Sequence, residues 1–189
     1  IGGYGPYIKE MNIWIKHFDH IVIVSPVRQV EFEKIDLAYK HPNIELTEIP
    51  EVNLISFSNI VRAFLVSPYI CLKIASAIRK ADHVHLRCPN NVGLLGCLVQ
   101  IFFPRKKKTA KYAGNWDWKS KQPWSYRLQQ RILRNTFLSH NLTTLVYGEW
   151  PDKTINIKPF FTASYTRREL LPVKKKPLMT KFHWLLLAH

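Results

Sequence analysis

Apolar residues along this chain fall into two kinds of pattern, which predict strands and helices in alternation. Continuous β-competent runs, or strict alternation of apolar and polar residues, predict strands at 20–25, 44–49, 83–86, 108–113 and 143–147. Apolar positions at helical spacing predict helices at 7–17, 59–80, 92–103 and 123–138, the second of them broken near Ser67 and Pro68. Strands and helices alternate at intervals of about 25 to 35 residues. This alternation predicts a Rossmann-like α/β fold, with a mostly parallel sheet and helices on both faces.

The first two strands differ in their patterns. The run at 20–25 is continuously apolar, which is typical of a strand buried on both faces, whereas 44–49 alternates like a half-buried strand near a sheet edge. A Rossmann-like half places a further strand before its first glycine turn, and nothing precedes Ile1 here. We therefore expect a piece of a longer protein, in which strands 20–25 and 83–86 lack a shared neighbour.

Polar loops follow three of the predicted strands. Strands 83–86, 108–113 and 143–147 are followed in turn by 87–91, 114–118 and 148–151. The carboxyl ends of parallel strands meet at one edge of a sheet, and ligands gather at that edge. The sequence therefore predicts one cleft that contains His85, Arg87, Asn90, Asp117 and Glu149.

Two stretches near this cleft have competing interpretations. Gly2, Gly3 and Tyr4 form a glycine turn ahead of the first helix, and such a turn either approaches a phosphate closely or is an ordinary loop. The loop at 114–118 combines donors, acceptors and aromatic faces, which suits the binding of a sugar or a base. Alternatively, the stretch is a turn in which a tryptophan covers the core.

Charge is the most unusual bulk property of the 189 residues. The chain has 28 lysines and arginines against 13 aspartates and glutamates, which gives a net charge of +15. This balance favours polyanionic partners such as nucleic acid, anionic lipid or nucleotide phosphates. The densest basic runs, 105–108 and 174–176, carry no interleaved aromatic residues, so we interpret them as solvated connections.

The remaining composition narrows the class of protein. A hydrophobic content of 47% predicts a globular protein with a good core, and the length of 189 residues favours one domain with the start of another. Cys71, Cys88 and Cys97 have no CxxC spacing, which predicts neither a zinc site nor a disulfide framework and favours a reducing compartment. No membrane span is expected, because the apolar stretch 60–81 contains charges and a proline, and 92–103 is shorter than the ~20 residues that a bilayer requires.

Four motifs together resemble a known family. They are Ile1-Gly-Gly before a helix, His20-Ile-Val-Ile-Val-Ser-Pro26, Asp82-His-Val-His-Leu-Arg-Cys-Pro-Asn90 and Tyr112-Ala-Gly-Asn-Trp-Asp117. In this order they resemble the N-terminal half of a family 4 (group 1) glycosyltransferase of the GT-B fold. The resemblance implies an acceptor-side Rossmann-like domain at 1–170. Residues 171–189 would then be the linker and first strand of a C-terminal donor domain.

The resemblance also implies roles for individual residues. The glycine turn of that family lies beside the donor diphosphate, which points to Gly2, Gly3 and Tyr4, and the acceptor side points to Arg87, Asn90, Asn91, Asn115 and Trp116. His85 is expected to orient a sugar hydroxyl, unless it is a core histidine satisfied within the sheet. Asp117 or Glu149 is expected to accept the hydroxyl proton, while Arg87 pairs with an acceptor phosphate. The chain departs from the family at Ala113 and Gly114, where a His-Gly pair is frequent.

The function that the resemblance implies is transfer of a sugar from a nucleotide-sugar donor to a glycan or lipid-linked acceptor, without a metal cofactor. The chain is expected to be inactive alone, because the donor site belongs to a second domain, in cis or in trans. Two alternatives stay open: a basic, non-catalytic polyanion-binding module, and one chain of a two-chain transferase. We expect a cytoplasmic protein, peripheral at the inner membrane face, where helix 123–138 and the run 105–108 contact anionic lipid.

Overall fold

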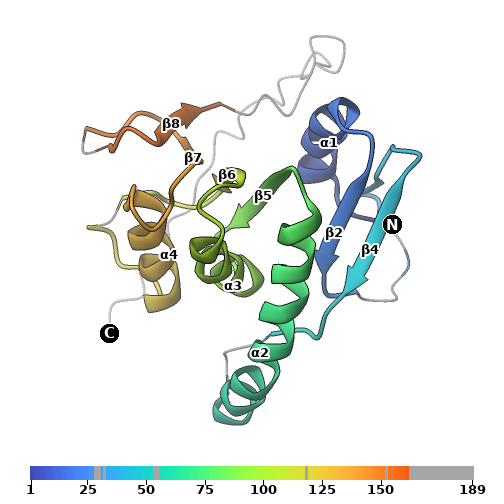
Figure 1. Cartoon of the computed structure of the whole chain (residues 1–189), viewed down its shortest axis with the longest axis horizontal. Coiled ribbons are helices and arrows are strands. Elements are labelled where there is room, and N and C mark those ends of the chain that lie inside the picture. Colours follow the sequence, from blue (N-terminus) through green and yellow to red (C-terminus); the bar gives the residue numbers. More distant parts are fainter. Residues whose placement is uncertain (28–30, 32, 53–55, 118, 152, 162–189) are drawn as a thin grey trace, which may run out of the picture.

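The computed structural model describes residues 1–27, 31, 33–52, 56–117, 119–151 and 153–161 (Figure 1). The strands are β1 (Gly2–Tyr4), β2 (Ile21–Ser25), β3 (Asp36–Ala38), β4 (Ile44–Glu48), β5 (His83–Cys88), β6 (Lys107–Tyr112), β7 (Leu142–Tyr147) and β8 (Ile157–Phe160). The α-helices are α1 (Gly5–Trp14), α2 (Phe57–Lys80), α3 (Asn91–Val99) and α4 (Trp124–Arg134). Two 3-10 helices, η1 (Ile15–His17) and η2 (Gln100–Phe102), extend α1 and α3.

The main sheet is parallel and has the strand order β5-β6-β7-β8. β2 and β4 form a separate parallel pair, and β1 and β3 form a short antiparallel pair. This arrangement confirms the predicted α/β class with a parallel sheet. Among the described residues, however, β2 pairs with β4 alone and β5 with β6 alone, so the parallel strands make two sheets.

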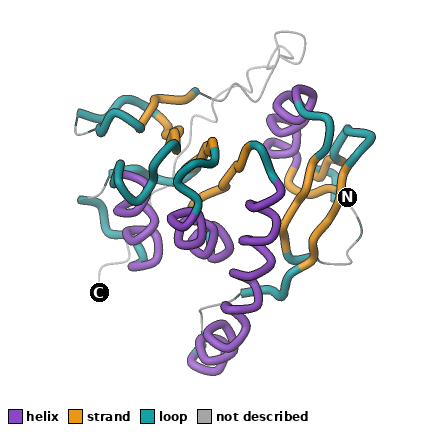
Figure 2. Tube along the Cα trace, viewed as in Figure 1, coloured by secondary structure: helices purple, strands orange, loops and turns teal. Residues whose placement is uncertain are grey.

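Helices cover both faces of the main sheet. Alternate side chains of β5 point to opposite faces, so Val84, Leu86 and Cys88 share one face and His83, His85 and Arg87 the other. The first set belongs to the hydrophobic core with buried residues of α2, α3 and α4, which follow one another across the molecule in Figure 2. The second set lies under α1, where Trp14 meets His85 edge to face with ring centroids 5.0 Å apart.

A buried ion pair fastens α1 to the main sheet. The ammonium group of Lys111 on β6 contacts the carboxylate of Glu10 on α1, and their side chains are 5% and 8% exposed. The same ammonium lies 5.3 Å from the ring centroid of Tyr147 on β7 and 4.9 Å from that of Phe160 on β8. Because a buried charge is costly without a partner, this cluster fixes α1 over three adjacent strands.

Two lysines of the basic run 105–108 serve the fold and are not solvated connections. Lys106 Nζ donates to the carbonyl oxygens of Arg79 and Ala81, at the C-terminus of α2, at 2.9 and 2.6 Å. Lys108, which is 2% exposed, donates from Nζ to Gln100 O at 3.2 Å and to Phe103 O at 3.0 Å. Cations suit helix C-termini because their carbonyl groups carry partial negative charge. Burial lowers the pKa of Lys108 to about 8.

Three sequence-based expectations about local structure are wrong. Gly2 to Tyr4 are an extended strand paired with β3 and not a turn, since the pairing supplies backbone partners that the local pattern does not reveal. α2 continues through Pro68, whose ring is tolerated on an exposed part of the helix. β2 is only half-buried, and Val22 is 40% exposed.

Other expectations shift in extent. α4 ends at Arg134, because the side chain of Asn135 accepts the backbone N–H groups of Phe137 and Leu138 and starts a turn. The short strands β3 and β8 were not predicted, since each has too few residues for a pattern to show. The basic run 174–176, the proposed boundary after residue 170 and Trp118 lie outside the described residues.

The structure predicts that replacing only one partner of the Glu10–Lys111 pair destabilises the protein. Lys111→Met leaves a buried carboxylate without its cation and should lower the free energy of unfolding by about 3–5 kcal/mol. Glu10→Leu combined with Lys111→Met removes both charges and should recover most of that loss. Urea denaturation measures both variants, with Lys107→Met at the exposed first position of the same strand as the control. A double variant as unstable as Lys111→Met would contradict the prediction.

Candidate functional site

The loops after β5 and β6 lie side by side at the carboxyl edge of the main sheet. The backbone N–H of Ala113 donates to the carbonyl oxygen of Cys88 at 2.7 Å, just beyond the last ladder pair of the two strands. Two side chains of α4 hydrogen-bond to the backbone of these loops. Gln129 Oε1 accepts the N–H of Asn90 at 3.4 Å, and Gln130 Nε2 donates to Asn115 O at 2.9 Å. The two buried glutamines therefore fix the loops relative to each other.

Asn90 shapes the first of these loops. Its Oδ1 accepts the backbone N–H of Gly93 at 2.6 Å, which caps the N-terminus of α3, and its Nδ2 donates to Arg87 O at 2.6 Å. A Cβ atom at Gly93 would lie 2.5 Å from the same carbonyl oxygen, so this turn needs a glycine. Asn91 Nδ2 donates to Val52 O at 2.8 Å and ties the loop to the segment that follows β4.

Arg87 presents a supported positive charge at the same edge. Its side chain is exposed, and its guanidinium carbon lies 3.8 Å from the ring centroid of Tyr7 in the first turns of α1. The Tyr7 hydroxyl hydrogen-bonds that of Tyr39, and burial raises the pKa of both phenols. Because the ring holds the planar guanidinium from one face, its N–H groups remain oriented for an anion.

The loop after β6 contains a buried residue, an exposed residue and a half-buried residue. Trp116 is 4% exposed and packs edge to face on Tyr112, with ring centroids 5.0 Å apart, so its ring covers the core. Asn115 is exposed, and its Oδ1 accepts the backbone N–H of Asp117 at 2.9 Å. Asp117 is half-buried, and its Oδ1 accepts the N–H of Lys119 at 2.9 Å. The local turn thus holds the Asp117 carboxylate in place.

His85 lies away from these loops, beneath α1. Its Nδ1 and the Nε2 of His83 both hydrogen-bond the Thr109 hydroxyl, at 3.0 and 2.9 Å. Burial, and after it the charges of His83 and Lys111, lower the pKa of His85 to about 4. Its Nε2 is buried and has no hydrogen-bond partner within the described part of the chain. His85 therefore packs between the main sheet and α1, but with Nε2 unpaired among the described residues it is not the fully satisfied core histidine of the alternative interpretation.

The remaining predicted residues lie at the periphery. Gly2, Gly3 and Tyr4 are in β1, and the first N–H of α1, from Gly5, donates to Ile35 O at 3.0 Å. A Cβ atom at Gly5 would clash with that carbonyl oxygen. The backbone just before β3 therefore comes so close to the start of α1 that only a glycine fits there. Glu149 is exposed in the turn after β7.

Sequence reasoning missed the residues that support the edge: Tyr7, Tyr39, Gln129, Gln130 and Lys111. The glutamine pair carried a usable signal, because Gln129 and Gln130 fall on the side of the predicted helix that bears Ile132 and Leu133. The tyrosines carried none, since their partners are distant in sequence. Among the described residues, no three His, Cys, Asp or Glu side chains gather as metal ligands, and Cys88 and Cys97 are free thiols with sulfurs 3.7 Å apart.

An open hollow lies at the opposite, amino end of β5. It has a volume of about 370 Å³ and is lined by Ile13, Trp14, His17, Phe18, His83 and Thr109. The lining is mostly apolar and contains no carboxylate, so it lacks the mixed polar groups of the carboxyl edge.

The cap at Asn90 gives a first prediction for this site. Asn90→Ala removes the acceptor for Gly93 and the donor to Arg87, so it should lower the free energy of unfolding by about 1 kcal/mol. Asn90→Asp retains the accepting oxygen and should lose less. Thermal unfolding followed by circular dichroism measures both, and equal stability of Asn90→Ala and the wild type would contradict the assignment.

The buried His85 gives a second prediction. Its pKa in the folded state, about 4, lies below the ordinary value of 6.5, so between these pH values the unfolded state binds the proton more readily. The free energy of unfolding should therefore fall by about 3 kcal/mol as the pH drops from 6.5 to 4, with little further change from this group below that. His85→Gln should flatten this slope, while His17→Gln, at an exposed position, should keep it. An unchanged slope in His85→Gln would contradict the prediction.

Comparison of the chain with known protein families, with characterised proteins and with solved structures finds no match.

Proposed function

We propose that this chain is the acceptor-binding half of a GT-B glycosyltransferase, which transfers a sugar from a nucleotide-sugar donor to a glycan or lipid-linked acceptor. The observation that carries the proposal is the carboxyl edge of the main sheet. There the Arg87 guanidinium rests on Tyr7, and the loop after β6 holds the Asp117 carboxylate. In parallel α/β sheets this edge is the usual place for a ligand.

Each side chain at the edge suits one task in glycosyl transfer. Arg87 pairs with a phosphate of the acceptor, because a guanidinium matches phosphate oxygens with two parallel N–H groups. Asp117 accepts the proton of the attacking sugar hydroxyl, and Asn115 beside it orders the hydroxyl through its exposed amide. Glu149 is the alternative base. His85 lies under α1, so the proposal gives it no contact with substrate.

The donor diphosphate would bind between this chain and a second domain, supplied in cis or in trans. Gly2, Gly3 and Tyr4 remain candidates for its contact on this side, as a short strand next to the first turn of α1. The nucleotide-sugar is a co-substrate and the proposal includes no metal. Turnover therefore depends on both halves, and the isolated 189-residue chain supplies acceptor binding alone.

The test is transfer of radiolabelled sugar when the chain is co-expressed with a GT-B donor-half chain. Membranes and soluble extract are supplied with UDP-, GDP- and dTDP-sugars and with lipid-linked or free glycan acceptors. Transfer should require both chains, and Asp117→Ala should lower turnover by about 100-fold or more, as expected for loss of a general base. Arg87→Ala should raise the KM for phosphate-bearing acceptors, while Arg127→Ala removes an exposed charge from α4 as the matched control.

Two outcomes would contradict the proposal. Full transfer by the Asp117→Ala and Arg87→Ala variants would show that the edge does not carry the chemistry. Absence of transfer, together with binding to DNA and RNA that falls steeply with salt, would instead favour the polyanion-binding module.

A further inference from the structure

α2 exposes an unusual amount of apolar surface for a helix of a folded domain. Its exposed large side chains are Ile60 (46%), Val61 (45%), Phe64 (79%), Leu65 (72%), Tyr69 (49%) and Leu72 (71%). The opposite side of the same helix is buried, because Ala63, Ile70, Ile74 and Ile78 are all at most 6% exposed. The helix is thus apolar on two sides, and only one of them contacts the core.

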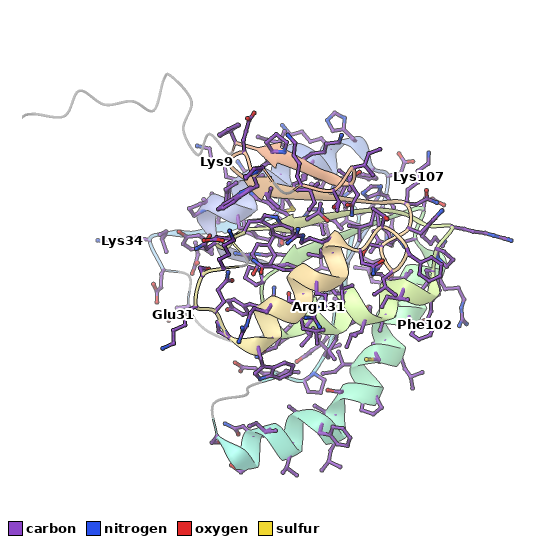
Figure 3. All side chains as sticks on the ribbon, turned by 90° about the vertical axis from the view of Figure 1, so that its left-hand side faces the viewer. Lys9, Glu31, Lys34, Phe102, Lys107 and Arg131 are labelled. Atoms are coloured by element: carbon purple, nitrogen blue, oxygen red, sulfur yellow. The ribbon has the colours of Figure 1, made fainter. Side chains whose placement is uncertain are left out.

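The exposed residues form a stripe along the helix. Val61, Leu65 and Leu72 are separated by four and seven residues, so their side chains share one face, with Phe64 next to them. The stripe covers about three turns, or roughly 18 Å of helix. Figure 3 shows α2 along the lower border of the molecule, with its N-terminal half extending beyond the other elements.

A basic row runs beside the stripe. Arg62, Lys73 and Lys80 are separated by eleven and seven residues, which places them on a common face, and residues 57–80 contain no aspartate or glutamate. Tyr69 lies in the same row, and Lys73 Nζ is 5.5 Å from its ring centroid. An apolar stripe bordered by cations is the pattern of a helix that lies in a membrane interface.

We propose that α2 docks on an anionic phospholipid surface, with the stripe at the boundary of the acyl chains and the basic row among the headgroups. Charge decides between the occupants. A second copy of a chain with a net charge of +15 would bring like-charged rows together, whereas anionic lipid complements them. Nucleic acid complements the charge but leaves the aliphatic stripe in water.

The helix lies on the surface and does not span it. By length and composition, Ser58–Lys80 could cross a membrane. The sequence predicts no span here, because this stretch contains charges and a proline. Ile70, Ile74 and Ile78 pack in the core with residues of the main sheet, and Lys106 holds the last carbonyls of the helix. These contacts keep the C-terminal half in the domain. The lipid contact is therefore assigned to α2 and not to the run 105–108, where Lys106 and Lys108 bond to backbone carbonyls.

Vesicle sedimentation of the full 189-residue chain tests the proposal. Sucrose-loaded vesicles are made from phosphatidylcholine alone, or from an equimolar mixture of phosphatidylcholine and phosphatidylglycerol. The wild type should sediment with the anionic vesicles at low salt and much less with the neutral ones. Leu65→Ser with Leu72→Ser should reduce partition about 100-fold, because two exposed leucines no longer enter the acyl boundary.

Two further variants separate apolar insertion from charge. Arg62→Gln with Lys73→Gln should reduce partition to anionic vesicles about 30-fold. Partition to neutral vesicles should not change. Ile13→Ser with Ile155→Ser removes two exposed isoleucines away from α2 and should bind like the wild type. Circular dichroism verifies that each variant keeps its fold, which is expected since every changed side chain is at least partly exposed.

Three outcomes would overturn the proposal. Recovery equal to that without vesicles would show that lipid is not the occupant. Unchanged partition of the Leu65→Ser, Leu72→Ser variant would place the contact elsewhere. A wild-type dimer in sedimentation velocity that the same variant converts to monomer would show that a second copy covers the stripe.

Discussion

The buried contact between Glu10 and Lys111 is the constraint on which the described structure depends. It joins α1 to the centre of the main sheet, and the rings of Tyr147 and Phe160 enclose the same ammonium group. With α1 held there, Tyr7 lies over Arg87 at one end of β5 and Trp14 lies over His85 in its middle. One ion pair thereby sets both the position of the cation at the carboxyl edge and the burial of the histidine below it.

Local pattern was sufficient to predict three of the four strands of the main sheet, β5, β6 and β7, to within a few residues. β5, β6 and β7 alternate or run apolar over enough residues for their period to show, and polar loops mark their carboxyl ends. Contacts between residues far apart in the sequence could not be predicted from the local pattern. Gly2 to Tyr4 look like a turn until β3 is placed beside them, and Lys106 and Lys108 look solvated until the carbonyl groups around them are known. The loop at 114–118 had two interpretations, because the packing of Trp116 on Tyr112 is a tertiary contact that a local pattern does not reveal.

One hydrogen bond connects the elements that carry the two proposed surfaces. α2 runs back from the carboxyl end of the parallel strands, so its exposed N-terminal half lies at the same end as the loops after β5 and β6. The hydrogen bond from Asn91 to Val52 ties the loop after β5 to the segment that leads into α2. Arg87 lies under α1, on the opposite face of the main sheet from α2, so a lipid-linked acceptor would have to reach it around the carboxyl edge.

The most direct measurement is a titration of the isotope-labelled 189-residue chain with a short-chain prenyl diphosphate sugar, followed by amide resonances in two-dimensional NMR. Acceptor binding at the carboxyl edge predicts saturable shifts at Arg87, Asn91, Asn115 and Asp117, and their loss in Arg87→Ala. Shifts confined to the hollow around Trp14, His83 and Thr109, or no shifts at saturating ligand, would contradict binding at that edge.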